Sequence, residues 1–236
     1  MSGILYGLGL GPGDPNLVTI KAASILRDVP VIVYLSPLTE NKADFSFARS
    51  IAAPHFSDEK TEINVPIQML KDPESGKRAY REACDKISAQ LNDGRNVAYL
   101  CEGDPLLYGS FVYILTLLRN TYRVITVPGV SSLSGAAATA NLPLVTRNQG
   151  FSIIPATLSE SVIKETIKKA DAIAILKLGK NIIKIKRILS ELGRFEQAVY
   201  VEFASTPDER VHMLQQAPDD APYFSLILVT KEKTVL

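Results

Sequence analysis

A glycine-rich segment near the start of the chain is the first candidate for binding chemistry. It runs Gly7-Leu8-Gly9-Leu10-Gly11-Pro12-Gly13-Asp14-Pro15, between a predicted buried strand at 3–10 and a predicted helix at 16–27. A dinucleotide fingerprint fails here, because its third glycine falls on Pro12 when counted from Gly7 and on Asp14 when counted from Gly9. No Gly-Lys pair completes a Walker pattern either. We expect a loop that lets a ligand approach the backbone closely, but not a pyrophosphate loop.

The second candidate is Glu102-Gly103-Asp104-Pro105, which follows a predicted strand at 96–100. Ligands of open α/β sheets bind beyond the carboxyl ends of the strands, so this loop and the first should converge on one edge. The Asp104 carboxylate can accept hydrogen bonds from a ribose or an amino group. It can equally serve as the N-cap of the following helix, with Pro105 in the first turn.

The third candidate is Pro128-Gly129-Val130-Ser131-Ser132, at the start of a predicted helix of small residues over 131–141. Ser131 or Ser132 suits the N-cap of that helix. A nucleophile elbow is excluded, because Leu133 stands where its closing glycine is required. The free N–H groups of the helix start can contact a ligand carboxylate.

The elements around these loops predict an α/β fold built from two halves. The first half has strands at 3–10, 29–35, 63–65, 96–100 and 123–127, helices at 16–27, 44–53, 77–92 and 110–118, and a turn at 72–76. The second half has helices at 131–141, 159–169 and 181–192 and strands at 151–155, 172–177, 198–203 and 225–230. The break at Pro128-Gly129 predicts an N-terminal domain over 1–127 and a C-terminal domain over 128–236.

Composition excludes several classes of protein. The 236 residues are 46% hydrophobic and carry a net charge of +1, so no basic excess points to nucleic acid. No apolar run approaches the ~20 residues of a membrane helix, and the N-terminus lacks the pattern of a signal peptide. Cys84 and Cys101 form no CxxC, and two such cysteines fit a cytoplasmic protein without disulfides. No His/Cys/Asp cluster has metal-ligand spacing, so we expect no intrinsic metal.

The three motifs together resemble the tetrapyrrole (corrin/porphyrin) methylases. Gly7 to Ala22 is similar to the N-terminal signature of that family, Tyr99 to Ser110 to its Gly-Asp-Pro motif, and Val127 to Ser132 to its third motif. The resemblance continues through Asn141-Leu142-Pro143-Leu144 and Val201-Glu202-Phe203-Ala204-Ser205, in order along the chain. Within the family, the stretch from Glu102 to Phe111 most resembles the enzymes that methylate C20 of precorrin-2 or of cobalt-factor II.

This resemblance implies two α/β domains with S-adenosyl-L-methionine in the cleft between them, and a homodimer. The charge balance and the lack of a long apolar run give no reason to expect a nucleic-acid or a membrane partner. By position in the motifs, the residues implied to contact the cofactor are Pro12, Glu102, Gly103, Asp104, Leu107, Ser131, Ser132, Leu176, Lys177 and Ala204. The segment Tyr34-Leu35-Ser36-Pro37 departs from the family pattern, so the resemblance assigns no residues to the substrate-facing loop after the second strand.

The chemistry implied is methyl transfer to carbon, with a tetrapyrrole such as precorrin-2 or cobalt-factor II as substrate and S-adenosyl-L-homocysteine as product. No general base can be assigned from the sequence, because His55 and His212 are the only histidines and both suit surface or capping roles. Candidate cations for the substrate carboxylates are Arg147, Lys177 and the group Lys77, Arg78 and Arg81, although each fits a solvated charge as well. The alternatives are another tetrapyrrole methylase, of the uroporphyrinogen III, precorrin-4 or diphthine type, or a non-catalytic nucleotide-binding module.

Overall fold

The computed structural model describes residues 1–37, 46–56, 59–67 and 73–230 of the chain. The chain separates into two compact units, Met1–Ser131 and Ser132–Leu236, where the sequence predicted a division after residue 127. Each unit is a β-sheet covered by helices on both faces, which confirms the predicted α/β class.

The first unit contains a five-stranded parallel sheet in the order β3-β2-β4-β1-β5. Its strands are β1 (Leu5–Gly9), β2 (Val31–Pro37), β3 (Thr61–Ile67), β4 (Val97–Cys101) and β5 (Val124–Val127). Its helices are η1 (Pro15–Leu17), α1 (Ile20–Asp28), α2 (Phe47–Ala52), η2 (Ala53–His55), α3 (Pro73–Asn92) and α4 (Phe111–Leu118).

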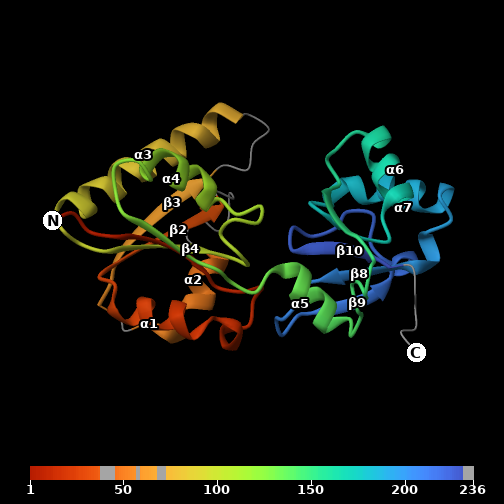
Figure 1. Ribbon diagram of the computed structural model, residues 1–236, viewed down its shortest axis with the longest axis horizontal. Coiled ribbons are helices and arrows are strands. Elements are labelled where there is room, and N and C mark those ends of the chain that lie inside the picture. Colours follow the sequence, from red (N-terminus) through yellow and green to blue (C-terminus); the bar gives the residue numbers. More distant parts are fainter. Residues whose placement is uncertain (38–45, 57–58, 68–72, 231–236) are drawn as a thin grey trace. The chain divides into compact units, whose positions relative to one another are not determined.

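Helices cover both faces of this sheet, α1 and α2 on one side and α3 and α4 on the other (Figure 1). Successive residues of a strand point to opposite faces, so Leu8 and Ile32 pack with α1 and α2, while Leu5 and Val33 pack with α3 and α4. A strand covered on both faces must be apolar throughout, and all of β4 is buried. This pattern explains why the sequence predicted the parallel sheet.

The second unit contains a mixed five-stranded sheet in the order β6-β7-β10-β8-β9. Its elements are α5 (Ser132–Thr139), β6 (Phe151–Pro155), α6 (Glu160–Lys169), β7 (Ala172–Leu176), η3 (Gly179–Asn181), α7 (Ile182–Glu191), η4 (Phe195–Gln197), β8 (Ala198–Glu202), β9 (Arg210–Met213), η5 (Leu214–Gln216) and β10 (Ser225–Val229). Only β6 and β7 pair in parallel, because the chain between β8 and β10 holds no crossover helix.

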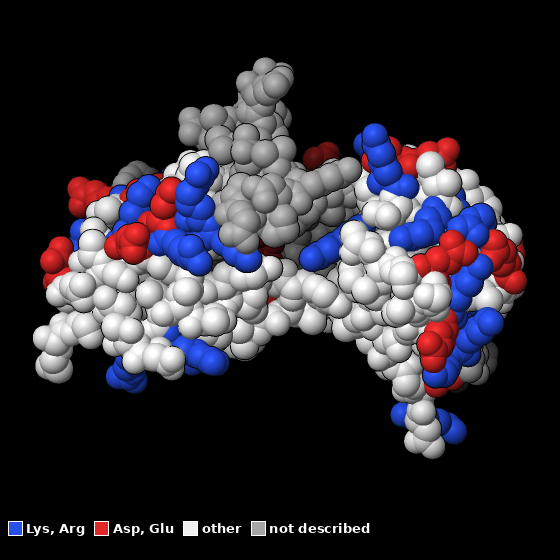
Figure 2. Space-filling view, turned by 90° about the horizontal axis from the view of Figure 1, so that it is seen from above, with Lys and Arg blue, Asp and Glu red and all other residues white. Residues whose placement is uncertain are grey.

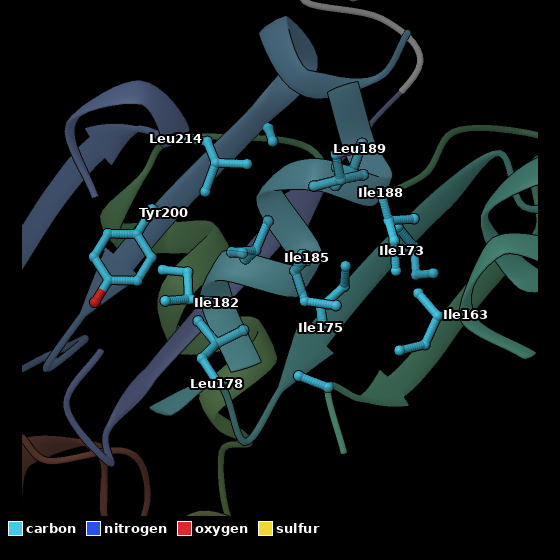
Figure 3. Packing of buried hydrophobic residues seen from close by; sticks show 14 of the residues in the cluster. Ile163, Ile173, Ile175, Leu178, Ile182, Ile185, Ile188, Leu189, Tyr200 and Leu214 are labelled. Atoms are coloured by element: carbon cyan, nitrogen blue, oxygen red, sulfur yellow. The ribbon is translucent and has the colours of Figure 1, made fainter. Parts of the chain in front are cut away.

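The core of the second unit lies mainly between its sheet and α6 and α7. Ile163 of α6 and Ile182, Ile185 and Ile188 of α7 pack on Ile175 and its neighbours in the strands, as Figure 3 shows. The opposite face of the sheet carries a smaller cluster in which Leu133 and Ala136 of α5 contact the strands. Both faces of this sheet are therefore buried as well.

The helix predicted over 16–27 begins later than expected. The Asp14 carboxylate accepts a hydrogen bond from the Asn16 N–H at 2.8 Å and caps the start of the short helix η1. The main helix α1 then starts at Ile20, with Thr19 as its N-cap. Ile20, in the helix predicted over 16–27, is 89% exposed, and the buried residues of α1 are Ala22, Ala23 and Leu26. The difference arises because Val18 and Thr19 have an extended backbone and separate η1 from α1.

Two other predictions need correction. The turn predicted at 72–76 is wrong for residues 73–76, because α3 begins at Pro73, a residue that suits the first helical turn. The strand β9 was missed because it has only four residues, too few for their alternation of polar and apolar side chains to stand out in the sequence. Residues 44, 45 and 72 of the predicted helix and turn lie outside the described residues.

The surface of each unit mixes acidic and basic side chains on the face that Figure 2 shows. One such group joins α6 to α7, where Arg187 and Lys164 both pair with Glu160 and Glu191. In the part of the chain that the structure describes, no helix is both long and apolar enough to cross a membrane.

A pair of isoleucines in α7 tests the core of the second unit. Ile185 is fully buried, whereas Ile183 is 56% exposed. Ile185→Ala should lower the free energy of unfolding by about 2–5 kcal/mol, because it leaves a cavity between α7 and the sheet. Ile183→Ala, the matched control, should change it by less than about 0.5 kcal/mol. Urea denaturation of both variants measures the difference, and equal effects would contradict this packing.

Candidate functional site

Three loops meet at the carboxyl edge of the first sheet. β4, β1 and β5 are parallel neighbours, so the loops that follow them leave the sheet on the same side. The first two loops are joined main chain to main chain: the Leu10 N–H donates to the Cys101 carbonyl at 2.9 Å, and the Gly103 N–H to the Gly11 carbonyl at 2.8 Å. The three motifs singled out in the sequence therefore form one structure.

Glycines permit this meeting because no side chain fits between the loops. A Cβ on Gly129 would lie 2.2 Å from the Gly103 carbonyl oxygen and 2.8 Å from the Gly9 Cα. A Cβ on Gly9 would lie 2.4 Å from the Gly129 nitrogen. Gly11 and Gly103 have φ angles of 80° and 63°, a region that glycine enters without steric cost. We call the contact of Gly9, Gly103 and Gly129 the glycine junction.

Asp104 closes the glycine junction with its side chain. One carboxylate oxygen accepts a hydrogen bond from the Leu106 N–H at 2.9 Å, and the other accepts one from the Gly129 N–H at 3.1 Å. The second bond ties the loop after β4 to the loop after β5. Asp104 is not the N-cap of a helix, because α4 begins at Phe111 with Ser110 at the cap position. Each oxygen keeps a lone pair for a further donor.

Glu102 presents a carboxylate beside the junction. Its Oε1 accepts a hydrogen bond from the Ala48 N–H at 3.2 Å, at the start of α2. The side chain is exposed, yet the surrounding protein removes enough of its water to raise the pKa of the carboxyl above its ordinary value. The backbone N–H groups of Ala48 and of Glu102 itself oppose that rise. A carboxylate in this position attracts a cationic group.

Apolar side chains continue this loop beyond Asp104. Leu106, Leu107 and Tyr108 are 53%, 38% and 48% exposed. Tyr108 has a φ of 57°, which a tyrosine adopts only at a cost. The backbone turns tightly here, because a Cβ on Gly109 would lie 2.6 Å from the Pro105 carbonyl oxygen. The loop therefore offers apolar surface directly beside two carboxylates.

The remaining candidates of the first unit lie in the same loops. Pro12 is half-buried in the glycine-rich loop. Ser131 is half-buried and directly precedes α5, and Ser132 is the first residue of that helix, one residue after the expected start. The structure thus brings Pro12, Ser131 and the residues Glu102, Gly103, Asp104 and Leu107 to loops of one sheet edge.

Leu176, Lys177 and Ala204 gather at one edge of the second sheet. β7 and β8 both run antiparallel to β10, so they are parallel to each other and their carboxyl ends share an edge. Leu176 ends β7 and is half-buried, and Lys177 follows it with a φ of 56°. Ala204 follows β8 and packs in the cluster that contains α5.

The cations proposed for the substrate are all exposed, which fits a binding role and a solvated charge equally. They are Arg147, Lys177, Lys77, Arg78 and Arg81. Ser36, in the segment that departs from the family pattern, is fully buried and donates to Asn64 Oδ1 at 2.7 Å. Among the described residues, no group of three or more His, Cys, Asp or Glu side chains is placed to hold a metal ion.

Two contacts at this edge were not predicted from the sequence. His55 Nε2 lies 2.9 Å from the Pro15 carbonyl oxygen and, since a carbonyl only accepts, Nε2 carries the proton. His55 therefore anchors the glycine-rich loop, while His212 lies half-buried in β9. The other contact joins Glu102 to Ala48. Both link residues 40 or more positions apart, and no local pattern in the sequence signals them.

The glycine junction can be tested by adding one methyl group. Gly129→Ala should destabilise the protein by at least about 1–3 kcal/mol, because the new Cβ overlaps backbone atoms that have no side chain to move. Gly76→Ala is the control, since nothing lies within 4 Å of a Cβ there and the residue is inside α3. That change should stabilise the protein by about 0.5–1 kcal/mol. Urea denaturation compares the stability of the two variants. A Gly129→Ala variant as stable as the native protein would contradict the glycine junction.

The raised pKa of Glu102 predicts a pH-dependent effect on stability. The folded protein disfavours the charged carboxylate, so this group stabilises the fold fully only below its unfolded pKa, near 4.5, and less as the pH rises. Glu102→Gln keeps the acceptor for Ala48 and removes the charge. The variant should melt at a higher temperature than the native protein at pH 8, and the gain should vanish towards pH 4.

Glu62→Gln provides the control of opposite sign. Arg49 donates two hydrogen bonds to Glu62 and holds the pKa of that carboxyl below its ordinary value. Glu62 therefore stabilises the fold above pH 4.5 and loses this effect in acid. Its variant should melt at a lower temperature at pH 8 and approach the native protein as the pH falls. If the melting temperatures of both variants changed in the same direction at pH 8, the raised pKa assigned to Glu102 would be contradicted.

Known proteins resemble this chain over nearly its whole length. Residues 4–217 match the model of the Tetrapyrrole (Corrin/Porphyrin) Methylases. A Precorrin-2 C(20)-methyltransferase from Sinorhizobium sp is 35% identical, with 97% of each chain covered. A Cobalt-precorrin-2 C(20)-methyltransferase from Salmonella typhimurium is 30% identical, with 98% of each chain covered.

Solved structures share the fold. A cobalt precorrin-4 methyltransferase superposes with a TM-score of 0.74 over 96% of this chain and 94% of its own, at 22% identity. A uroporphyrin-III C-methyl transferase from Thermus thermophilus, in complex with S-adenosyl homocysteine, superposes with a TM-score of 0.68. The match covers 96% of this chain and 97% of the other chain, at 27% identity. The match of the family model and the two relatives lead to one assignment: the chain belongs to the tetrapyrrole (corrin/porphyrin) methylase family.

Proposed function

We propose that this protein is an S-adenosyl-L-methionine-dependent methyltransferase that adds a methyl group to C20 of precorrin-2, or of its cobalt-containing form, in cobalamin biosynthesis. One observation carries the choice of reaction. The relatives that cover nearly the entire chain at 30% and 35% identity are C20-methyltransferases, one named for the metal-free substrate and one for the cobalt form.

The site of the first unit suits this cofactor. S-adenosyl-L-methionine carries a sulfonium cation next to the methyl group that it donates to a nucleophilic carbon. The Glu102 carboxylate is exposed, and Asp104 lies two residues away with lone pairs to spare. A phosphate would be repelled by these carboxylates, whereas a cation is attracted. The relative from Thermus thermophilus was crystallised with the demethylated product.

We assign the cofactor contacts to the ten residues named from the motifs. In the first unit, Glu102 and Asp104 would face the methionine part and the ribose, with Pro12, Gly103, Leu107 and Ser131 lining the loops around them. In the second unit, Ser132, Leu176, Lys177 and Ala204 would contact the cofactor, with Leu176 and Ala204 towards the adenine. Their places at the carboxyl edges of the two sheets support this assignment.

These residues orient the cofactor relative to the substrate, and they exclude water from the site. The meso carbon of a reduced tetrapyrrole is enamine-like and already nucleophilic, so alignment with the methyl group is the main requirement. Positioning alone can lower a barrier by about 7–11 kcal/mol. The glycine junction and the Asp104 clamp supply fixed contacts of this kind, and the Glu102 carboxylate attracts the sulfonium and so contributes to binding of the cofactor.

The proposal extends to a cytoplasmic homodimer. Both cysteines are free and buried, which fits a reducing compartment. The proposal of a dimer rests on the resemblance to the family. A measurement of the mass of the native protein in solution tests it.

Methyl transfer with carbon-13-labelled cofactor tests the reaction. The protein, incubated with labelled S-adenosyl-L-methionine and either precorrin-2 or the cobalt form, should place one labelled methyl group at C20. S-adenosyl-L-homocysteine should bind with a Kd of about 1 µM or tighter, that is ~8 kcal/mol, and NAD should not bind detectably. A label at another ring carbon would indicate a different tetrapyrrole methylase. Binding without turnover of any tetrapyrrole would favour a non-catalytic module.

A further inference from the structure

The loop between β8 and β9 carries Ala204 in a conformation that needs support. Phe203 and Ser205 have φ angles of 47° and 62°, so the residues on both sides of Ala204 adopt a left-handed conformation without being glycine. Thr206 folds back on the loop, with its N–H and its hydroxyl donating to the Phe203 carbonyl at 3.1 and 2.8 Å. Strain of this kind persists only where surrounding contacts hold it.

Glu209 makes the contacts that fix this loop to another element. Its Oε2 accepts two hydrogen bonds, from the Ser205 N–H at 3.0 Å and from the Thr139 hydroxyl at 3.0 Å. Its own N–H donates to the Thr206 carbonyl at 3.1 Å. Thr139 is the last residue of α5, the helix that begins at Ser132. One carboxylate oxygen thus joins the loop of Ala204 to the helix that carries Ser132.

The same helix and loop also share apolar contacts. Ala204 packs in the cluster that contains Leu133 and Ala136 of α5, on the face of the sheet opposite α6 and α7. Apolar contacts are not directional and allow the loop of Ala204 to shift along α5. The hydrogen bond from the Thr139 hydroxyl to Glu209 is directional and fixes one position. The carboxylate of Glu209 therefore determines where Ala204 lies relative to α5.

We propose that Glu209 is a positioning residue for the cofactor: it holds Ala204 in register with Ser132, and so shapes the side of the second unit that receives the adenosine. This inference rests on the proposed function, in which both residues contact S-adenosyl-L-methionine. Glu209 itself need not touch the ligand, since it acts through the loop and the helix.

The neighbouring residue Asp208 supplies a matched control. It lies in the same turn and carries the same charge, and both residues are exposed. Within the described residues, the Asp208 carboxylate accepts no hydrogen bond, and only its N–H is used, towards the Thr206 hydroxyl. Replacing Asp208 therefore changes the local charge without breaking the link to α5.

The test compares Glu209→Ala, Glu209→Gln and Asp208→Ala with the native protein by calorimetric titration with S-adenosyl-L-homocysteine. Glu209→Ala should bind it about tenfold more weakly, the scale on which a hydrogen bond to a charged group acts. Glu209→Gln keeps an acceptor oxygen and should recover most of the affinity. Asp208→Ala should stay within about twofold of the native protein. In turnover, Glu209→Ala should raise the KM for S-adenosyl-L-methionine and leave the KM for the tetrapyrrole unchanged.

Native affinity in Glu209→Ala would overturn the inference, and so would an equal loss in Asp208→Ala, which would indicate a general charge effect. If Glu209→Ala does not fold, Thr139→Val replaces it, because it removes only the link to α5. That variant should bind about threefold more weakly, and unchanged affinity would overturn the inference. Failure of the native protein to bind S-adenosyl-L-homocysteine would instead contradict the proposed function.

Discussion

The candidate site of the first unit depends on one steric constraint, the contact of three backbones at Gly9, Gly103 and Gly129. Parallel strands bring the ends of β4, β1 and β5 to one edge, but they do not bring the loops into contact. Contact requires that no Cβ stands between them. Once the loops touch, their polar groups must be satisfied, and the Gly11–Gly103 hydrogen bonds and the Asp104 clamp do this. The positions of Glu102 and Leu107 follow from that arrangement.

The two carboxylates of this loop serve different purposes although they are two residues apart. Asp104 uses both oxygens to hold backbone N–H groups, so its first role is structural and any ligand must use its remaining lone pairs. Glu102 makes one hydrogen bond to the start of α2 and is exposed, and the folded protein raises the pKa of its carboxyl. A charge held in that way costs stability in the folded protein. Such a cost is typical of a group that is kept for binding rather than for folding.

The sequence predicts the elements of this fold well where local chemistry decides them. The buried strands and the amphipathic α3 were recognisable from their apolar patterns, and the three motifs from their glycines, aspartates and prolines. Errors arose where two signals competed, as at Val18 and Thr19, whose extended backbone divides the helix predicted over 16–27 into η1 and α1. The mixed second sheet could not be derived, because the direction of β10 depends on the whole chain between β8 and β10. Contacts such as Glu209–Thr139 join residues 70 positions apart and leave no trace in a local pattern.

The two units hold their candidate loops by different physical means, and this difference has consequences for how each can vary. In the first unit, the loops are tied by the Asp104 clamp but meet through main chain and glycine, so almost any side chain at Gly9 or Gly129 is excluded by overlap. In the second unit, positive φ angles occur at Lys177, Phe203 and Ser205, where a strained residue costs on the order of 1–3 kcal/mol. Around Phe203 and Ser205 the strain is offset by side-chain hydrogen bonds from Thr206 and to Glu209. A steric junction admits one residue type, whereas a polar tether admits any side chain that supplies the same donor or acceptor. The first unit can therefore provide a fixed cradle for the cofactor, and the second unit can be adjusted in small steps without rebuilding its sheet.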